Sequence, residues 1–226
     1  MATSLEIRAW RGLAIVTIAM GILLFVPAGT LHYWQAWVYL LVVTVASVLT
    51  TLYLIKHDPA LLERRLKGGP RAEKTPTQRV IMLFMSLGFV ALLVVPALDF
   101  RLGWSALPVG IVALGDLLVA MGFYGISRVY RENSFASATV GVVENQKVIS
   151  TGPYSIVRHP MYAWALLYLA GKPLALGSYW GLIVLVALVP ILVWRLMDEE
   201  KLLVKELPGY LDYQKQVKYR LVPFVW

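Results

Sequence analysis

A long run without charged residues dominates the N-terminal part of the sequence: residues 12–55 contain no aspartate, glutamate, lysine or arginine. The hydrocarbon core of a bilayer is ~30 Å thick, and a helix needs ~20 apolar residues to cross it. The 44 residues of this run therefore predict two membrane-spanning helices, near 11–28 and 33–55. Pro27 and Gly29 mark the tight turn between them. This run alone argues against a water-soluble globule.

The composition of the whole chain agrees with a membrane protein. Of its 226 residues, 59% are hydrophobic and 15% are charged, whereas soluble domains have ~45–50% and ~25%. The chain has no cysteine, which excludes disulfides, thiolate metal sites and a cysteine nucleophile. The formal net charge is +8, which in so apolar a chain indicates cytoplasmic loops beside anionic lipid. We expect membrane lipids as partners, with neither nucleic acid nor metal.

Four further helices follow from the same pattern of apolar and charged segments. They are expected near residues 80–98, 104–128, 160–172 and 179–197. The basic segments 56–79 and 128–158 and the basic C-terminal tail are placed in the cytoplasm, as are both termini. The prediction is an all-α integral membrane protein with about six membrane-embedded helices, the last two a helical hairpin, plus a cytoplasmic C-terminal helical tail. The fifth helix is short, so it stays open whether the hairpin crosses fully.

The polar residues are distributed unevenly over the chain, which we expect to form one membrane domain over residues 1–226. The N-terminal four-helix part, 1–130, has few, and two of its features have alternative interpretations. Asp116 lies inside a predicted helix, where an ionisable group is either functional or hydrogen-bonded within the bundle. The basic segment 56–79 either binds anionic lipid or covers a pocket. The C-terminal part, 131–226, should carry the chemistry.

The densest polar cluster in the C-terminal part is at residues 151–162. Gly152-Pro153 predicts a turn, and Pro160 suits the first turn of a helix, with His159 as its cap. The free amides of a helix start attract anions, and Arg158 adds a positive charge. The alternative is a basic interfacial turn before a membrane helix.

A second cluster, Arg195 with Asp198-Glu199-Glu200, ends the last predicted helix. Arg195 and Glu199 are four residues apart and share a helical face, so an interfacial ion pair is the alternative to a functional role. Both clusters should lie on the cytoplasmic side, where they can face each other across a pocket at the membrane surface. The long polar segment that precedes them, near 131–150, favours a binding loop or lid over a solvated connection.

These residues resemble the isoprenylcysteine carboxyl methyltransferase family, which is related to membrane phospholipid methyltransferases. The resemblance covers roughly residues 133–226, while the first four helices are similar only in hydropathy. It rests on Gly152-Pro153-Tyr154, Arg158-His159-Pro160-Met161-Tyr162, Arg195 with Asp198-Glu199-Glu200, and Pro208-Gly209-Tyr210 followed by Tyr213. It implies a membrane enzyme that uses S-adenosylmethionine, bound in a cytoplasm-facing pocket formed by the final helices and the tail.

The resemblance also implies roles for individual residues. The residues implied in cofactor binding are Thr139, Gln146, Lys147, Val148, Ile149, Tyr154, His159, Pro160, Tyr162 and Glu199. Arg195 would hold the carboxylate of the substrate and would be catalytic together with Glu199. Where the eukaryotic members have histidine, this chain has Gln146, whose amide can also form hydrogen bonds.

The expected reaction is methyl transfer from S-adenosylmethionine to a lipophilic acceptor, foremost the carboxylate of an isoprenylcysteine or a similar amphiphile. A carboxylate is ionised at pH 7 and needs no base, only orientation and partial desolvation. The alternatives on the same fold are N-methylation of a lipid amine, which needs a base, and S-methylation of a thiol. A non-enzymatic transporter or scaffold is a further alternative, but no polar path crosses the predicted helices.

Overall fold

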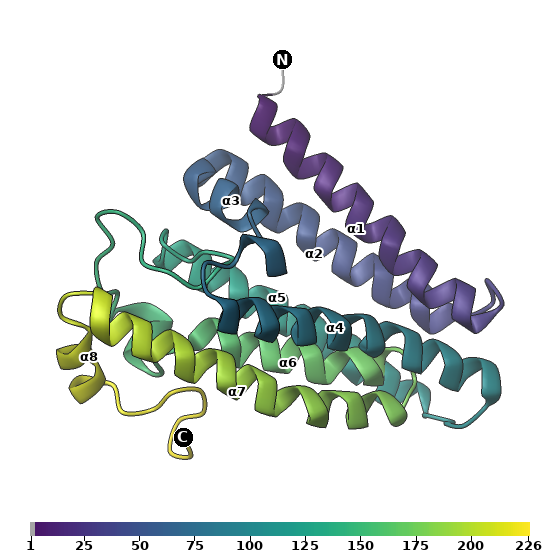
Figure 1. Cartoon of the computed structure of the whole chain (residues 1–226). Coiled ribbons are helices and arrows are strands. Elements are labelled where there is room, and N and C mark those ends of the chain that lie inside the picture. Colours follow the sequence, from purple (N-terminus) through teal and green to yellow (C-terminus); the bar gives the residue numbers. More distant parts are fainter. Residues whose placement is uncertain (1–2) are drawn as a thin grey trace.

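The computed structural model describes residues 3–226, and every regular element in that range is a helix. Within that range, length and hydropathy make five helices candidates for crossing a membrane. They are α1 (Ser4–Ala28), α2 (Trp34–His57), α4 (Pro76–Leu102), α5 (Val109–Glu132) and α7 (Trp180–Glu206). Figure 1 shows the α1–α2 hairpin lying along the bundle, where α1 packs on α4 and α2 on α5. The all-helical fold predicted from the sequence is confirmed.

The predicted hairpin at the end of the chain differs from expectation in the lengths of its helices. α6 (Pro160–Ala175) lies between α5 and α7 (Figure 1) and ends three residues later than predicted. Its 16 residues span only ~24 Å, less than the ~30 Å of the bilayer core, so the expectation of a short fifth helix is confirmed. Of the six expected membrane helices, five thus meet the criteria for a span in the described part of the chain. α7 continues to Glu206 because the charged residues that follow its apolar segment still favour a helix.

Short helices gather at the end of the bundle where α5 and α7 end and α4 and α6 begin. They are α3 (Pro59–Leu66), the 3₁₀ turns η1 (Pro70–Ala72) and η2 (Gly152–Ser155), and α8 (Tyr210–Gln216) in the tail. The segment predicted as a basic loop therefore contains a helix, which Asp58 caps by accepting a hydrogen bond from the backbone N–H of Leu61 at 2.9 Å. Leu61 and Leu62 anchor this helix, because both side chains are buried.

Glycines allow α5 and α6 to pack with their backbones in close contact. A Cβ atom at Gly115 would lie 2.1 Å from the backbone nitrogen of Ala175, and one at Gly122 would lie 2.8 Å from that of Tyr168. Small residues at such positions are typical of membrane helix pairs, which associate through close packing and not through the hydrophobic effect. This close packing fixes the position of the first turn of α6 relative to the end of α5.

Asp116 and Lys172 are ionisable residues inside the bundle, away from its polar end. Oδ1 of Asp116 is buried without a hydrogen-bond partner among residues 3–226, so the hydrogen bond expected of a structural Asp116 is not found for this atom. Lys172 on α6 is fully buried, and its Nζ lies 3.3 Å from the centroid of the Phe89 ring. This contact is a cation–π interaction. Neither ionisable group lines the pocket described below.

Candidate active site

A pocket opens at the polar end of the bundle, between the segment 133–149, the start of α6, the end of α7 and α8. Both clusters singled out in the sequence contribute to its wall. Every predicted site residue lines it: Thr139, Gln146, Lys147, Val148, Ile149, Tyr154, His159, Pro160, Tyr162, Arg195 and Glu199. The structure therefore brings these residues together, while their roles in binding and catalysis stay predictions.

The first turn of α6 has the predicted cap, and the two backbone amides that precede this helix have partners in the C-terminal tail. His159 is the N-cap and Pro160 is the first helical residue, as the sequence indicated. The backbone N–H groups of Arg158 and His159 donate to the carbonyl oxygens of Tyr219 and Arg220, both at 2.9 Å. The C-terminal tail thus satisfies these two amides, so they are not available to an anion.

Glu200 is the centre of a buried ionic cluster beside this turn. Its carboxylate accepts from Nε of Arg158 at 2.7 Å and from Nε of Arg220 at 2.9 Å, and lies 3.2 Å from Nε2 of His159. The side chains of Glu200 and Arg158 are each only 6% exposed. Arg158 was expected to supply a free positive charge, but Glu200 compensates that charge.

Replacing Glu200 with alanine is expected to lower the free energy of unfolding by about 3–5 kcal/mol, because Arg158 would remain buried without its carboxylate. In a chain of this length that loss corresponds to a fall in the apparent Tm of roughly 6 °C or more. The measurement is thermal unfolding of the protein purified in detergent. Glu206→Ala, the same substitution at an exposed position at the end of α7, should leave the Tm nearly unchanged. Equal small effects in both variants would contradict this role of Glu200.

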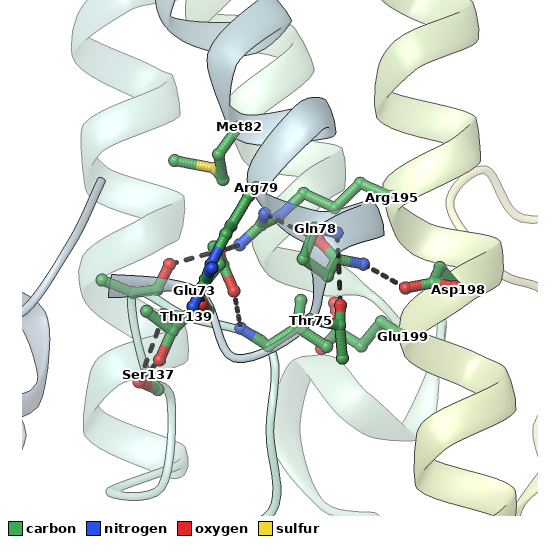
Figure 2. A network of polar contacts seen from close by, with 12 residues as sticks. Glu73, Thr75, Gln78, Arg79, Met82, Ser137, Thr139, Arg195, Asp198 and Glu199 are labelled. Carbon is green, nitrogen blue, oxygen red and sulfur yellow. Dashed lines mark hydrogen bonds and ion pairs between the residues drawn. The ribbon is translucent and has the colours of Figure 1, made fainter. Parts of the chain in front are cut away.

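Arg195 is held from several sides by groups that come from distant parts of the chain (Figure 2). Its Nε donates to the hydroxyl of Tyr162 at 3.2 Å, and its Nη1 donates to the side-chain oxygen of Gln78 at 3.0 Å. Its Nη2 donates to the carbonyl oxygen of Ala138 at 3.2 Å and lies 2.9 Å from Oε1 of Glu73. The contact with Glu73 is an ion pair without the alignment of a hydrogen bond.

Glu199 does not form the intrahelical ion pair with Arg195 that their spacing allowed. Its carboxylate accepts a hydrogen bond from the hydroxyl of Tyr162, which connects it indirectly to Arg195. Within residues 3–226, Glu199 takes part in no ion pair, although Arg158 and Arg195 in the same pocket wall do. Glu199 is thus a pocket carboxylate whose charge has no cation in contact with it.

Two hydrogen bonds fix Tyr154 in the pocket wall. Its hydroxyl oxygen accepts from Nδ2 of Asn133 at 2.8 Å, and its carbonyl oxygen accepts from the hydroxyl of Tyr213 on α8 at 2.7 Å. Burial raises the pKa of Tyr154 to about 12. The side chain therefore stays protonated at neutral pH, where it can form hydrogen bonds but cannot act as a base.

Comparison with known families identifies the part of the chain that carries this pocket. Residues 111–208 match the phospholipid methyltransferase family. That family belongs to the same superfamily of membrane methyltransferases as the isoprenylcysteine enzymes, so the resemblance noted in the sequence is confirmed. The match and the apolar helices together indicate a multi-pass membrane methyltransferase, and they leave the acceptor undetermined. No curated protein matches the chain.

Two side chains that hold the pocket residue Arg195 were missed in the sequence, and both lie before the segment that matches the family. Glu73 and Gln78 come from the connection between η1 and α4 and the first turn of α4, and both are buried. In the sequence Glu73 is one of three acidic residues in the basic segment 56–79, a pattern typical of a solvated loop. The hypothesis that segment 56–79 covers a pocket came nearest to their position, because Glu73 contacts the pocket residue Arg195.

Proposed function

We propose that this membrane methyltransferase transfers the methyl group of S-adenosylmethionine to a lipophilic acceptor at the cytoplasmic surface of the membrane. The observation that carries the proposal is the pocket itself, in which an uncompensated carboxylate, Glu199, faces a wall of apolar and hydrogen-bonding residues. S-adenosylmethionine combines a cationic sulfonium and ammonium with a flat, largely apolar base, so these residues fit its chemistry.

The pocket residues divide into three roles toward such a cofactor. Val148 and Ile149 supply apolar surface for the base, and Glu199 supplies a carboxylate for a cationic group. Tyr154 and Tyr162 present hydroxyl groups whose positions are already fixed by other side chains. The remaining predicted cofactor residues, Thr139, Gln146, Lys147, His159 and Pro160, complete the wall. When bound, the cofactor supplies an activated methyl group, so with a carboxylate acceptor the protein needs to provide only orientation and exclusion of water.

For the acceptor, a carboxylate such as that of an isoprenylcysteine needs no deprotonation, and Arg195 is the pocket residue able to orient it. A lipid amine is the second candidate, favoured by the match to the phospholipid methyltransferase family and by the ion pair that occupies Arg195. An amine must lose a proton before it attacks. Glu199 is the pocket carboxylate available for that step.

The experiment measures binding of S-adenosylmethionine and S-adenosylhomocysteine to the detergent-purified protein by calorimetry. Saturable binding of both is expected. Transfer of radiolabelled methyl groups to N-acetyl-S-farnesylcysteine, phosphatidylethanolamine and a long-chain thiol then identifies the acceptor. A well-folded protein that binds neither compound would refute the proposed function and would favour a transporter or scaffold.

A further inference from the structure

Glu73 is buried and held in one position, although it lies in a connection between helices. Its side chain is 1% exposed. Oε2 accepts a hydrogen bond from the backbone N–H of Val140 at 3.0 Å, while Oε1 forms the ion pair with Arg195. Its carbonyl oxygen accepts from Nε of Arg79 at 3.0 Å. Backbone and side chain are therefore both anchored, so the carboxylate has a defined place beside the guanidinium.

Glu73 contacts Arg195 from outside the pocket. Arg195 is among the residues that line the pocket, whereas Glu73 and Gln78 are not. Gln78 also fixes the guanidinium, and its own Nε2 donates to a carboxylate oxygen of Asp198 at 2.6 Å (Figure 2). An acceptor in the pocket would therefore meet Arg195 with Glu73 already behind it.

The ion pair decides how much positive charge Arg195 presents to the pocket. Arg195 is only 7% exposed and Glu73 is less so, which leaves little solvent to screen the pair. An anionic group that approaches the guanidinium is attracted by Arg195 and repelled by the carboxylate of Glu73, which lies 2.9 Å from Nη2 of Arg195. It is also repelled by Glu199, whose charge has no ion-pair partner in the described chain.

We propose that Glu73 is a specificity-determining residue: by compensating the charge of Arg195, it weakens binding of anionic acceptors relative to neutral ones. The inference rests on the proposed function, because it concerns the acceptor of the same pocket. Glu73 acts through Arg195 and does not touch the acceptor. Loss of its charge should strengthen the attraction between Arg195 and an anionic headgroup while a neutral headgroup is little affected.

The test compares N-acetyl-S-farnesylcysteine with its carboxamide, two probes with the same tail and a different headgroup charge. Their affinities are measured by calorimetry on the detergent-purified protein saturated with S-adenosylhomocysteine. In Glu73→Gln the affinity ratio of carboxylate to carboxamide should rise about tenfold over the wild-type ratio. Glu73→Asp retains the charge and should retain the wild-type ratio. A purely structural role of Glu73 would lower both affinities without changing their ratio.

Glu63→Gln is the matched control, because Glu63 is a half-exposed carboxylate on α3 that pairs with Lys67 at 3.1 Å and lies outside the pocket wall. This variant should keep the wild-type ratio. An unchanged ratio in Glu73→Gln overturns the inference, as does an equal change in Glu63→Gln. Absence of measurable binding of the carboxylate probe to Glu73→Gln overturns it as well. A Glu73→Gln protein that no longer binds S-adenosylhomocysteine also overturns it. Failure of the wild-type protein to bind that compound instead overturns the proposed function.

Discussion

Replacing Glu199 with alanine should weaken binding of S-adenosylmethionine by about 10- to 100-fold. Glu199 is the pocket carboxylate without an ion-pair partner in the described chain, so we expect the cofactor to supply the missing cation. A hydrogen bond that involves a charged group contributes about 1.5–3 kcal/mol, and 1.4 kcal/mol is tenfold in affinity. Calorimetric titration of the detergent-purified variant measures the loss.

Two further variants make the result specific to this carboxylate. Glu199→Gln keeps the shape and an acceptor for the hydroxyl of Tyr162, so it separates loss of charge from loss of packing. Glu144→Ala removes an exposed carboxylate from the segment 133–149 and should leave the affinity unchanged. Wild-type affinity in both Glu199 variants would show that the cofactor's cationic groups are held elsewhere.

Substituting alanine for Gly115 should destabilise the bundle by about 3 kcal/mol or more, the upper end of the usual cost of overpacking. The added Cβ would lie 2.1 Å from the backbone nitrogen of Ala175 and 2.6 Å from the carbonyl carbon of Leu174. No change of side-chain rotamer relieves such a contact, so α5 and α6 must separate. The expected fall in apparent Tm, roughly 6 °C or more, is measured by thermal unfolding in detergent.

Gly110→Ala on the same helix is the control, since a Cβ atom there has nothing within 4 Å. It should be neutral or slightly stabilising, because alanine favours a helix by up to about 1 kcal/mol over glycine. If Gly115→Ala were as stable as Gly110→Ala, the close contact of α5 with α6 would be refuted.

Hydropathy was sufficient to predict the long helices, because the run 12–55 can satisfy its backbone in a bilayer only as helices. It also predicted that the fifth helix would be short, since the apolar segment that begins at Pro160 is interrupted at Lys172 and Pro173, and α6 ends at Ala175. It missed the end of α7, because charged residues continue that helix beyond its apolar segment.

The sequence was sufficient to predict which polar residues would lie near the pocket, but not which of them would form ion pairs with each other. Arg158 and Arg195 were recognised as charged pocket residues, yet their partners Glu200 and Glu73 are distant in the chain. Sequence spacing reveals only neighbours on one helix, as with Arg195 and Glu199, and that pair is not formed. Which charge is compensated depends on the packing of helices and connections, and this determines what the pocket can attract.

The backbone hydrogen bonds between the C-terminal tail and the start of α6 also determine when the pocket can be completed during synthesis. Arg158 and His159 donate their backbone N–H groups to carbonyl oxygens of residues 219 and 220, which leave the ribosome after every residue of the pocket wall. Until then the first turn of α6 lacks these acceptors, and Glu200 lacks Arg220. The nascent chain therefore inserts its helices before it has a finished site, and the contacts that complete the site form only once translation has passed residues 219 and 220.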